Sequence, residues 1–229
     1  MNIVKLDSKT WRIEDGFVYF YLLAGTQKAL MIDSGVTPND AFKLASELTS
    51  LPVILANTHG DGDHMAGNKS FGEFYLNHED YNRRQTKENF ADCKWHDLTE
   101  GMVFDLGERD IEVIEIPGHT YGSVAFLDVT NRVLYSGDTV SDAIIYLFGE
   151  HRNTAAFKDS LIKLANMENR YDVIYPAHGT PVVGKNHAQK VLEDWEGVMN
   201  GTLEWTPETL FGNKVRTYHG ANCGFYLAD

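Results

Sequence analysis

Short predicted strands that each end in a turn carrying histidine or aspartate recur along this chain, and this arrangement most restricts how it can fold. Residues 52–56 lead into NTHGDGDH, and residues 111–116 lead into PGHT. Residues 132–136 lead into Gly-Asp-Thr, and residues 172–175 lead into PAHGT. Such short apolar runs predict strands, and loops at strand ends are where a rigid scaffold presents reactive side chains. We therefore expect several strand ends to meet at one polar site.

Helical patterns separate several of these strands. Helices are predicted over 38–49, 64–70, 78–88, 154–168 and 186–199, the first with Asn39 or Thr37 as its N-cap. Further strands are predicted over 18–23, 29–32 and 123–128. Strands outnumber helices, which is typical of a layered α/β fold with mixed sheets. No repeat or linker divides the sequence, so residues 1–229 are expected to form a single domain.

Composition excludes several classes of protein. The 229 residues are 43% hydrophobic, enough for a sizeable core, and no run of about 18 apolar residues indicates a membrane span. The net charge of −13 repels nucleic acid and anionic lipid, so we expect a small-molecule substrate rather than either partner. The two cysteines are expected to be inert and the N-terminus lacks a secretory signal, so a cytoplasmic protein is expected. The oligomeric state stays open.

The segment HGDGDH at residues 59–64 holds two imidazoles and two carboxylates within six residues. Gly60 and Gly62 permit tight bends that would turn alternate side chains inward. Imidazole and carboxylate together suit zinc, iron or manganese, and the absence of cysteine argues against a structural thiolate zinc site. With the residues at the other strand ends, the candidate metal ligands are His59, Asp61, Asp63, His64, His119, Asp138 and His178.

These motifs, in this order, resemble those of the metallo-β-lactamase-fold hydrolase superfamily, whose pattern is HxHxDH followed by His, Asp and His. The resemblance covers about residues 15–185 and includes the segment IDSG at 32–35. It implies a four-layer αβ/βα sandwich, with two mixed β-sheets flanked by helices and a dinuclear metal site at one edge. The implied ligands of one metal are His59, Asp61 and His119, those of the other are Asp63, His64 and His178, and Asp138 bridges the two.

Asp61 departs from the family pattern, in which most members carry histidine. Two divalent ions, three aspartates and one hydroxide sum to zero charge, whereas a histidine at position 61 would leave +1. A less positive site polarises a carbonyl less and favours harder ions such as manganese or iron. An acidic residue here resembles the diiron branch of the superfamily, although no flavodoxin domain fits after residue 185. The alternative for Asp61 is a capping or supporting role at the helix over 64–70.

The function predicted from these residues is that of a metal-dependent hydrolase. Two divalent ions, zinc being expected and iron or manganese the alternatives, would hold a hydroxide that attacks a small ester, thioester or lactone. Asp63, besides being a ligand, is the expected catalytic residue that orients the nucleophile and accepts its proton. The alternatives are a diiron oxidoreductase that reduces oxygen or nitric oxide with a separate electron donor, and a non-catalytic metal-binding fold.

The remaining histidines receive structural or open roles. Exposed or helix-end positions are expected for His78, His96 and His187. The stretch 139–152, which contains His151 and Arg152, is either a lid over the metal site or a helix and loop packed by its apolar residues. Tyr218 and His219 are expected in a closing strand, with a role in the pocket as the alternative.

Overall fold

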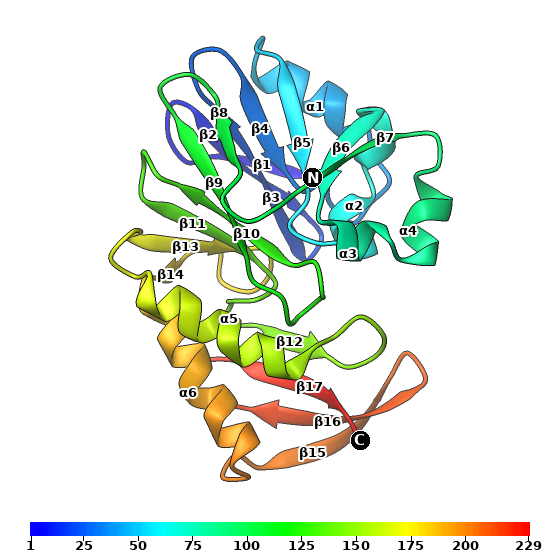
Figure 1. The fold of residues 1–229 in the computed structure, drawn as a ribbon, viewed down its shortest axis with the longest axis vertical. Helices are drawn as coiled ribbons and strands as arrows, with labels where there is room; N and C mark the ends of the chain where they lie inside the picture. Colours follow the sequence, from blue (N-terminus) through cyan, green and yellow to red (C-terminus); the bar gives the residue numbers. More distant parts are fainter.

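All 229 residues are described by the structure, a computed structural model with three β-sheets in successive layers (Figure 1). The N-terminal sheet has seven strands in chain order: β1 (Asn2–Lys5), β2 (Thr10–Asp15), β3 (Val18–Ala24), β4 (Ala29–Ile32), β5 (Val53–Ala56), β6 (Glu73–Leu76) and β7 (Lys94–Asp97). The central sheet has six, in the spatial order β14 (Val183–Gly184), β13 (Val173–Pro176), β11 (Val133–Gly137), β10 (Val124–Asp128), β9 (Asp110–Glu115) and β8 (Val103–Asp105). The C-terminal sheet has four: β12 (Ile144–Leu147), β17 (Gly224–Ala228), β16 (Asn213–His219) and β15 (Trp205–Leu210).

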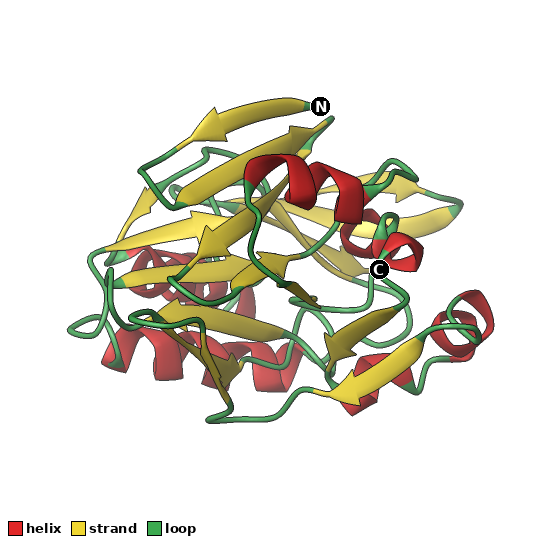
Figure 2. Ribbon diagram, turned by 90° about the horizontal axis from the view of Figure 1, so that it is seen from above, coloured by secondary structure: helices red, strands yellow, loops and turns green.

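Six helices lie around the stacked strands, as the view in Figure 2 shows. Those that follow strands of the N-terminal sheet are α1 (Ala41–Leu48), α2 (Gly62–Met65), α3 (His78–Tyr81) and α4 (Arg84–Asn89). The two long helices of the C-terminal half, α5 (Thr154–Asn166) and α6 (His187–Met199), pack against each other. None of these helices has the length and the apolar character that crossing a membrane requires.

Strand β3 shows why the first two sheets stack. Successive side chains of a strand point to opposite faces, and residues on both faces of β3 are buried. Tyr21 and Leu23 face the central sheet and belong to a cluster with Val113 and Phe126. Leu22 and its neighbours on the other face pack against α1 in a separate cluster. The N-terminal sheet is therefore covered on both sides, by helices and by the central sheet, as the predicted sandwich requires.

The C-terminal sheet is a third sheet that the predicted two-sheet sandwich did not include. Its residues Ile145 and Phe225 share a core of 21 buried residues with Phe157 of α5, Trp195 of α6 and Leu127 of the central sheet. Burial of this size in one contiguous cluster stabilises the whole C-terminal half together. Because this core joins the central sheet to the added one, we propose that residues 1–229 form one domain.

Several local predictions need correction. Residues 144–147 form strand β12, paired in parallel with β17, so a helix in the 139–152 stretch is wrong. The helix over 64–70 is wrong in extent, since α2 ends at Met65 and a single 3₁₀ turn follows over Asn68–Ser70. The helix over 78–88 divides into α3 and α4. Asp40, rather than Asn39 or Thr37, caps α1 by accepting from the Lys43 backbone N–H. The other predicted helices and strands are confirmed to within a few residues.

Candidate metal centre

The seven candidate ligands come together where four strands end. The segment 59–64 follows β5 of the N-terminal sheet. His119, Asp138 and His178 follow β9, β11 and β13 of the central sheet. The site thus lies at the edge where the two sheets meet, and the expectation that these strand ends converge is confirmed by the distances between the side chains.

Two glycines permit the sharp turns that follow β9 and β11. Gly118, beside His119, has φ +150°, and a Cβ at this position would lie 2.4 Å from the Phe157 Cα atom. Gly137, beside Asp138, has φ +53°, and its Cβ would lie 2.9 Å from the Thr58 side chain. Residues with a Cβ rarely adopt such backbone angles. The predicted bends at Gly60 and Gly62, by contrast, do not use positive φ angles.

One group of potential ligands consists of His59, Asp61 and His119. The two Nε2 atoms of His59 and His119 are 3.2 Å apart. Asp61 Oδ2 lies 3.3 Å from His119 Nε2 and 3.7 Å from His59 Nε2. A single ion among these three atoms would have two nitrogen ligands and one oxygen ligand, a set that suits zinc and iron.

A second group consists of Asp63, His64 and His178. Asp63 Oδ2 lies 3.5 Å from His64 Nε2 and 3.5 Å from His178 Nε2. In each of the two groups, the potential ligand atoms all lie within 4.8 Å of one another. The two groups therefore offer the same donor set, two imidazole nitrogens and one carboxylate oxygen.

Asp138 lies between the two groups. Its Oδ2 is 3.5 Å from His119 Nε2 and 3.2 Å from His178 Nε2, while its Oδ1 is 3.3 Å from His64 Nε2. Asp138 Oδ1 and His64 Nε2 are both buried and have no hydrogen-bond partner. Buried polar atoms without partners are costly, and both atoms are of the kind that coordinate metals. These residues could therefore hold divalent metal, and Asp138 directs one oxygen or the other towards each group.

The four imidazoles are oriented by contacts at their other nitrogen. His59 Nδ1 contacts Thr58 Oγ1 at 3.0 Å, and the Nδ1 atoms of His64, His119 and His178 each lie 2.9 Å from an oxygen, of Asp33, Tyr146 and Phe17 respectively. Contacts of this kind fix the tautomer and ring orientation of metal-binding histidines. Every Nε2 atom is left to face the cluster.

The charges within the cluster favour the forms that bind metal. Burial and the neighbouring His64 hold the pKa of His59 well below its usual value, so this ring is neutral. Burial raises the pKa of the Asp138 carboxyl, but His178, His64 and His59 outweigh it and leave that pKa well below its usual value. Metal ligands must be deprotonated. His64 differs, since burial lowers its pKa but Asp138, Asp63 and Asp33 together raise it well above normal.

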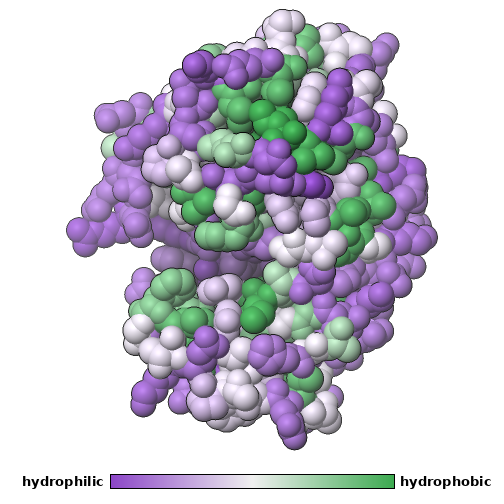
Figure 3. All heavy atoms as spheres, turned by 180° about the vertical axis from the view of Figure 1, so that it is seen from behind, coloured by the Kyte–Doolittle hydropathy of each residue, from purple (hydrophilic) through white to green (hydrophobic).

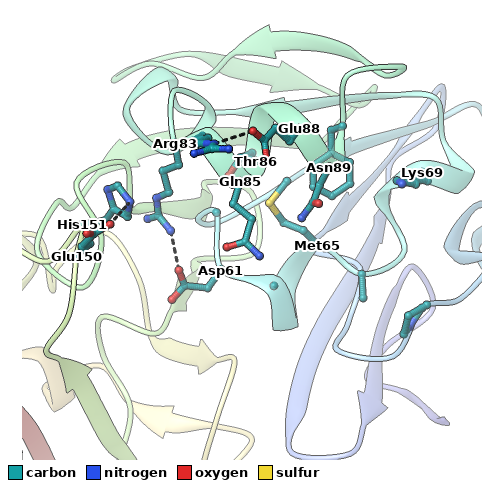
Figure 4. Close-up of a pocket in the computed structure, with 16 residues that line it drawn as sticks. Asp61, Met65, Lys69, Arg83, Gln85, Thr86, Glu88, Asn89, Glu150 and His151 are labelled. Atoms are coloured by element: carbon teal, nitrogen blue, oxygen red, sulfur yellow. Dashed lines mark hydrogen bonds and ion pairs between the residues drawn. The ribbon is translucent and has the colours of Figure 1, made fainter. Parts of the chain in front are cut away.

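Asp61 has two arginine partners that the sequence did not suggest. Arg83 Nη1 donates to Asp61 Oδ1 at 2.7 Å, a contact drawn in Figure 4, and Arg152 Nη2 donates to Asp61 Oδ2 at 2.6 Å. Although Asp61 is the N-cap residue of α2, its carboxylate makes no capping hydrogen bond, so the capping role is wrong. The two guanidiniums also offset the negative charge that was expected to make the site neutral.

The cluster forms the floor of a cleft of about 660 Å³, and Figure 3 shows a hollow with a hydrophilic floor between the upper layers and the C-terminal sheet. Aromatic side chains line its walls: Phe17, Tyr146, Phe211 and Tyr226. Three of these four come from the C-terminal sheet or its β15–β16 turn. A second hollow of about 960 Å³ lies on the Arg83 side of Asp61 (Figure 4).

One alternative placed the 139–152 stretch over the metal site, and Tyr146 and Arg152 of that stretch do line the cleft. The other aromatic residues of the wall were missed, because isolated aromatic residues usually indicate core positions. The histidines with expected structural roles lie outside the cluster: His78 and His187 begin α3 and α6, and His96 lies in β7. Tyr218 and His219 end β16, which confirms the closing strand. Arg152 of the 139–152 stretch lines the cleft, whereas His151 lines the second hollow.

Comparison with known proteins gives consistent results. Residues 13–178 match the sequence family described as the metallo-beta-lactamase superfamily. A hydroxyacylglutathione hydrolase of Francisella tularensis subsp. tularensis is 31% identical over 177 residues, which cover 77% of this chain and 68% of the relative. An acyl-coenzyme A thioesterase, MBLAC2 of Gallus gallus, is 24% identical over 69% of this chain and 71% of the relative.

Two solved structures show the same fold. A metallo-beta-lactamase from Pontibacter korlensis superposes with a TM-score of 0.70 at 17% identity, covering 85% of this chain and 98% of the other. A metallo-beta-lactamase family protein from Thermus thermophilus gives 0.67 at 18% identity, covering 90% and 86%. The order of the motifs, the stacked mixed sheets and these matches agree, and the chain belongs to the metallo-beta-lactamase superfamily as one of its hydrolases.

Proposed function

We propose that this chain hydrolyses a thioester of a small apolar acyl group with a dinuclear metal centre. The observation that carries the proposal is the placement of two equivalent ligand groups on either side of Asp138, whose carboxylate reaches both. His59, Asp61 and His119 would hold one ion, and Asp63, His64 and His178 the other. Divalent ions so held supply Lewis acidity and a water that is acidic enough to act as the nucleophile near neutral pH.

The protein's own groups have separable tasks in this reaction. Asp63 is the proposed catalytic residue: its Oδ2 faces the cluster near His64 and His178, where it orients the attacking water and accepts a proton. The imidazoles, held at Nδ1, keep the ligand atoms in place without rearrangement. The aromatic wall excludes water from the substrate's apolar part.

Two observations support a thioester among the substrates considered. The relatives at 31% and 24% identity are named as hydrolases of hydroxyacylglutathione and of acyl-coenzyme A, and both names denote thioesters. The cleft wall is aromatic, which suits an apolar acyl group because apolar surface is removed from water on binding. An ester or a lactone places the same carbonyl over the metals and is a weaker candidate on these grounds.

Zinc is the metal that we propose, with iron or manganese as the alternatives. The case for a diiron oxidoreductase depended on the negative charge of Asp61, and Arg83 and Arg152 now offset that charge. We further propose a cytoplasmic location, where two unpaired thiols stay reduced. A small-molecule substrate rather than nucleic acid follows from the net charge of −13.

The test is hydrolysis by the zinc-loaded protein of three substrates that share one small apolar acyl group: its coenzyme A thioester, its glutathione thioester and an oxygen ester. We expect the thioesters to be hydrolysed faster than the ester, and chelation to abolish activity until zinc is restored. Metal-loaded protein that hydrolyses none of the three would contradict the proposal. Consumption of oxygen or nitric oxide by an iron-loaded protein with a chemical reductant would instead support the oxidoreductase.

A further inference from the structure

The Asp61 carboxylate is held from two sides by groups that are themselves anchored. Arg83 donates a hydrogen bond to one carboxylate oxygen of Asp61, and Arg152 donates to the other. Oδ2, which accepts from Arg152, also faces His119 Nε2 at 3.3 Å and His59 Nε2 at 3.7 Å. A carboxylate oxygen has two lone pairs, so Oδ2 can accept a hydrogen bond from Arg152 and still coordinate an ion between the two imidazoles.

Arg83 connects Asp61 to a fully buried carboxylate. Arg83 Nη2 donates to Asp80 Oδ1 at 2.5 Å, and Asp80 is 0% exposed. Asp80 also accepts from the Gly60 and Gly122 backbone N–H groups, at 2.7 and 3.1 Å, and from Thr120 Oγ1 at 2.7 Å. The loops that carry Asp61 and His119 are thus joined through Asp80, so neither can move away from the other without breaking charge-assisted hydrogen bonds.

Arg152 makes a parallel link from the cleft side of Asp61. Its Nη2 donates to Asp61, and its Nη1 donates to the His119 backbone carbonyl at 2.7 Å. One planar guanidinium therefore fixes the distance between two ligands of the same group, which a lysine with a single point charge could not do. The side chain is only 15% exposed, which strengthens such contacts relative to a surface pair.

Charge balance explains why two arginines accompany the unusual aspartate. Asp61 and Asp80 carry two negative charges, and Arg83 and Arg152 carry two positive ones, so the set is neutral. A histidine at position 61 would be neutral by itself. Asp61 together with its charged partners is therefore as neutral as the imidazole of a histidine would be. The net positive charge of the metal site is then the same as with a histidine at position 61.

We propose that Arg83 and Arg152 are positioning residues: they hold the Asp61 carboxylate where it can coordinate the metal of the His59–Asp61–His119 group, here called the first metal. The proposal rests on the dinuclear function proposed above, but it concerns only the His59–Asp61–His119 group. It predicts that the arginines affect one metal and leave the other, held by Asp63, His64 and His178, unchanged. It also predicts that Asp61→His, by itself, weakens the first site, because Arg152 is then left beside an imidazole without its carboxylate.

The experiment is a titration of the metal-free full-length chain with Co²⁺, followed by its visible absorption and by calorimetry, with zinc content measured in parallel. The variants are Arg83→Ala, Arg152→Ala, Arg152→Lys, Asp61→Asn and, as a matched control, Arg84→Ala. Arg84 adjoins Arg83 but is 90% exposed and paired with Glu88. Wild type and Arg84→Ala should show two binding steps with the same affinities.

Arg83→Ala and Arg152→Ala should each weaken the same step about 10- to 100-fold, the usual effect of losing a group that supports a metal ligand. Both variants should leave the spectrum of the other step intact. Arg152→Lys should recover part of the loss, and Asp61→Asn should lose the same step as Arg152→Ala. Retention of both steps at wild-type affinity in Arg152→Ala, or an equal loss of both, would overturn the proposal.

Two further outcomes are decisive. If Arg152→Ala does not fold, as judged by circular dichroism, Arg152→Lys decides the question: it keeps the charge but cannot contact both Asp61 and His119, and wild-type affinity for both metals in this variant overturns the proposal. A wild-type chain that binds no metal would refute the dinuclear function and the positioning role with it. Wild-type affinity for both metals in every variant of Arg83 and Arg152 would refute the positioning role alone.

Discussion

The sandwich of the N-terminal and central sheets differs from the C-terminal sheet in what each contributes to the cleft. All seven candidate ligands follow strands of the sandwich, whereas Tyr146, Phe211 and Tyr226 of the cleft wall belong to the C-terminal sheet and its turn. The family match ends at residue 178, before β15 to β17 begin. The candidate ligands and most of the aromatic wall therefore come from separate parts of the fold, and we propose that metal binding and the fit of the substrate are divided in the same way.

One contact crosses this division. The Tyr146 carbonyl of β12 lies 2.9 Å from His119 Nδ1, so the C-terminal sheet touches the metal site through its backbone. Side-chain substitutions in that sheet leave this carbonyl in place. The division consequently predicts that such substitutions change substrate affinity while the metal content stays the same.

The largest effect is expected at Asp138, which both ligand groups share. Asp138→Asn should lose both metals and, with them, activity, because a neutral amide cannot balance two cations. Metal affinity should fall by more than the about 10-fold to 100-fold decrease that follows removal of a group supporting a ligand. Metal analysis and thioester hydrolysis check this, with His78→Ala, a partly exposed histidine outside the cluster, as the control. Two tightly bound metals in Asp138→Asn would show that this carboxylate does not join the sites.

Asp33 provides a more selective change within the sandwich. It accepts from the Thr58 backbone N–H and hydroxyl, at 2.7 and 2.8 Å, and contacts His64 Nδ1 at 2.9 Å. Asp33→Asn should weaken the metal bound by His64 about 10- to 100-fold, since the ring loses its anionic partner. Asparagine tolerates the φ of +63° at this position, so the backbone should be retained.

Asp15→Asn is the matched control for this change. Asp15 is also buried and holds the neighbouring turn through the Val36 and Thr37 backbone N–H groups, but it contacts no candidate ligand. Calorimetric titration should show a lower metal affinity for Asp33→Asn only. Equal losses in both variants would mean that the effect arises from general destabilisation of this turn.

Phe211 tests the proposed role of the C-terminal sheet in binding the substrate. It lines the cleft from the tip of the β15–β16 turn and is 84% exposed, so its removal should hardly affect stability. Phe211→Ala should raise KM for the thioester of a small apolar acyl group such as butyryl about 3- to 10-fold through lost apolar contact. The effect on an acetyl thioester should be smaller. Trp205 is an exposed aromatic residue of the same sheet outside the cleft, so Trp205→Ala should leave KM for both thioesters unchanged. A loss of metal in Phe211→Ala would break the division.

The smallest effect is expected where the two regions join, at His187. Burial lowers the pKa of this histidine, against the opposing effects of the Ser141 backbone, Asp142 and Asp194. Below its ordinary pKa of 6.5, the unfolded chain takes up a proton that the folded chain does not. The contribution of His187 to the free energy of unfolding should therefore be fully present above pH 6.5 and be lost as the pH decreases below it.

His187→Gln removes this proton uptake. Urea unfolding between pH 7.5 and 5 should give a shallower pH dependence for the variant than for wild type. The difference between the two proteins isolates His187 from the histidines of the metal site, which both retain. Parallel curves would show that the His187 environment does not favour its neutral form.

The metal site was more predictable than the cleft wall, for physical reasons. Imidazoles and carboxylates at strand ends, beside Gly or Pro, have few structural uses, so the pattern at residues 59–64 and His119 indicated the chemistry directly. Strand β12 was ambiguous because four apolar residues suit either a helix or a strand, and its partner β17 lies 80 residues later in the chain. Arg83 gave no signal, since an arginine next to another arginine on a polar helix usually faces solvent.

The most direct test of the dinuclear centre is the number and identity of metal ions in the 229-residue chain, purified anaerobically without chelator. We expect two ions per chain, zinc in both positions, and a decrease to one when Arg152 is replaced by alanine under limiting zinc. A single ion in wild type that is unaffected by Asp61→Ala would contradict a site at His59, Asp61 and His119. Two iron ions with an oxygen-sensitive absorption band would contradict the hydrolytic function.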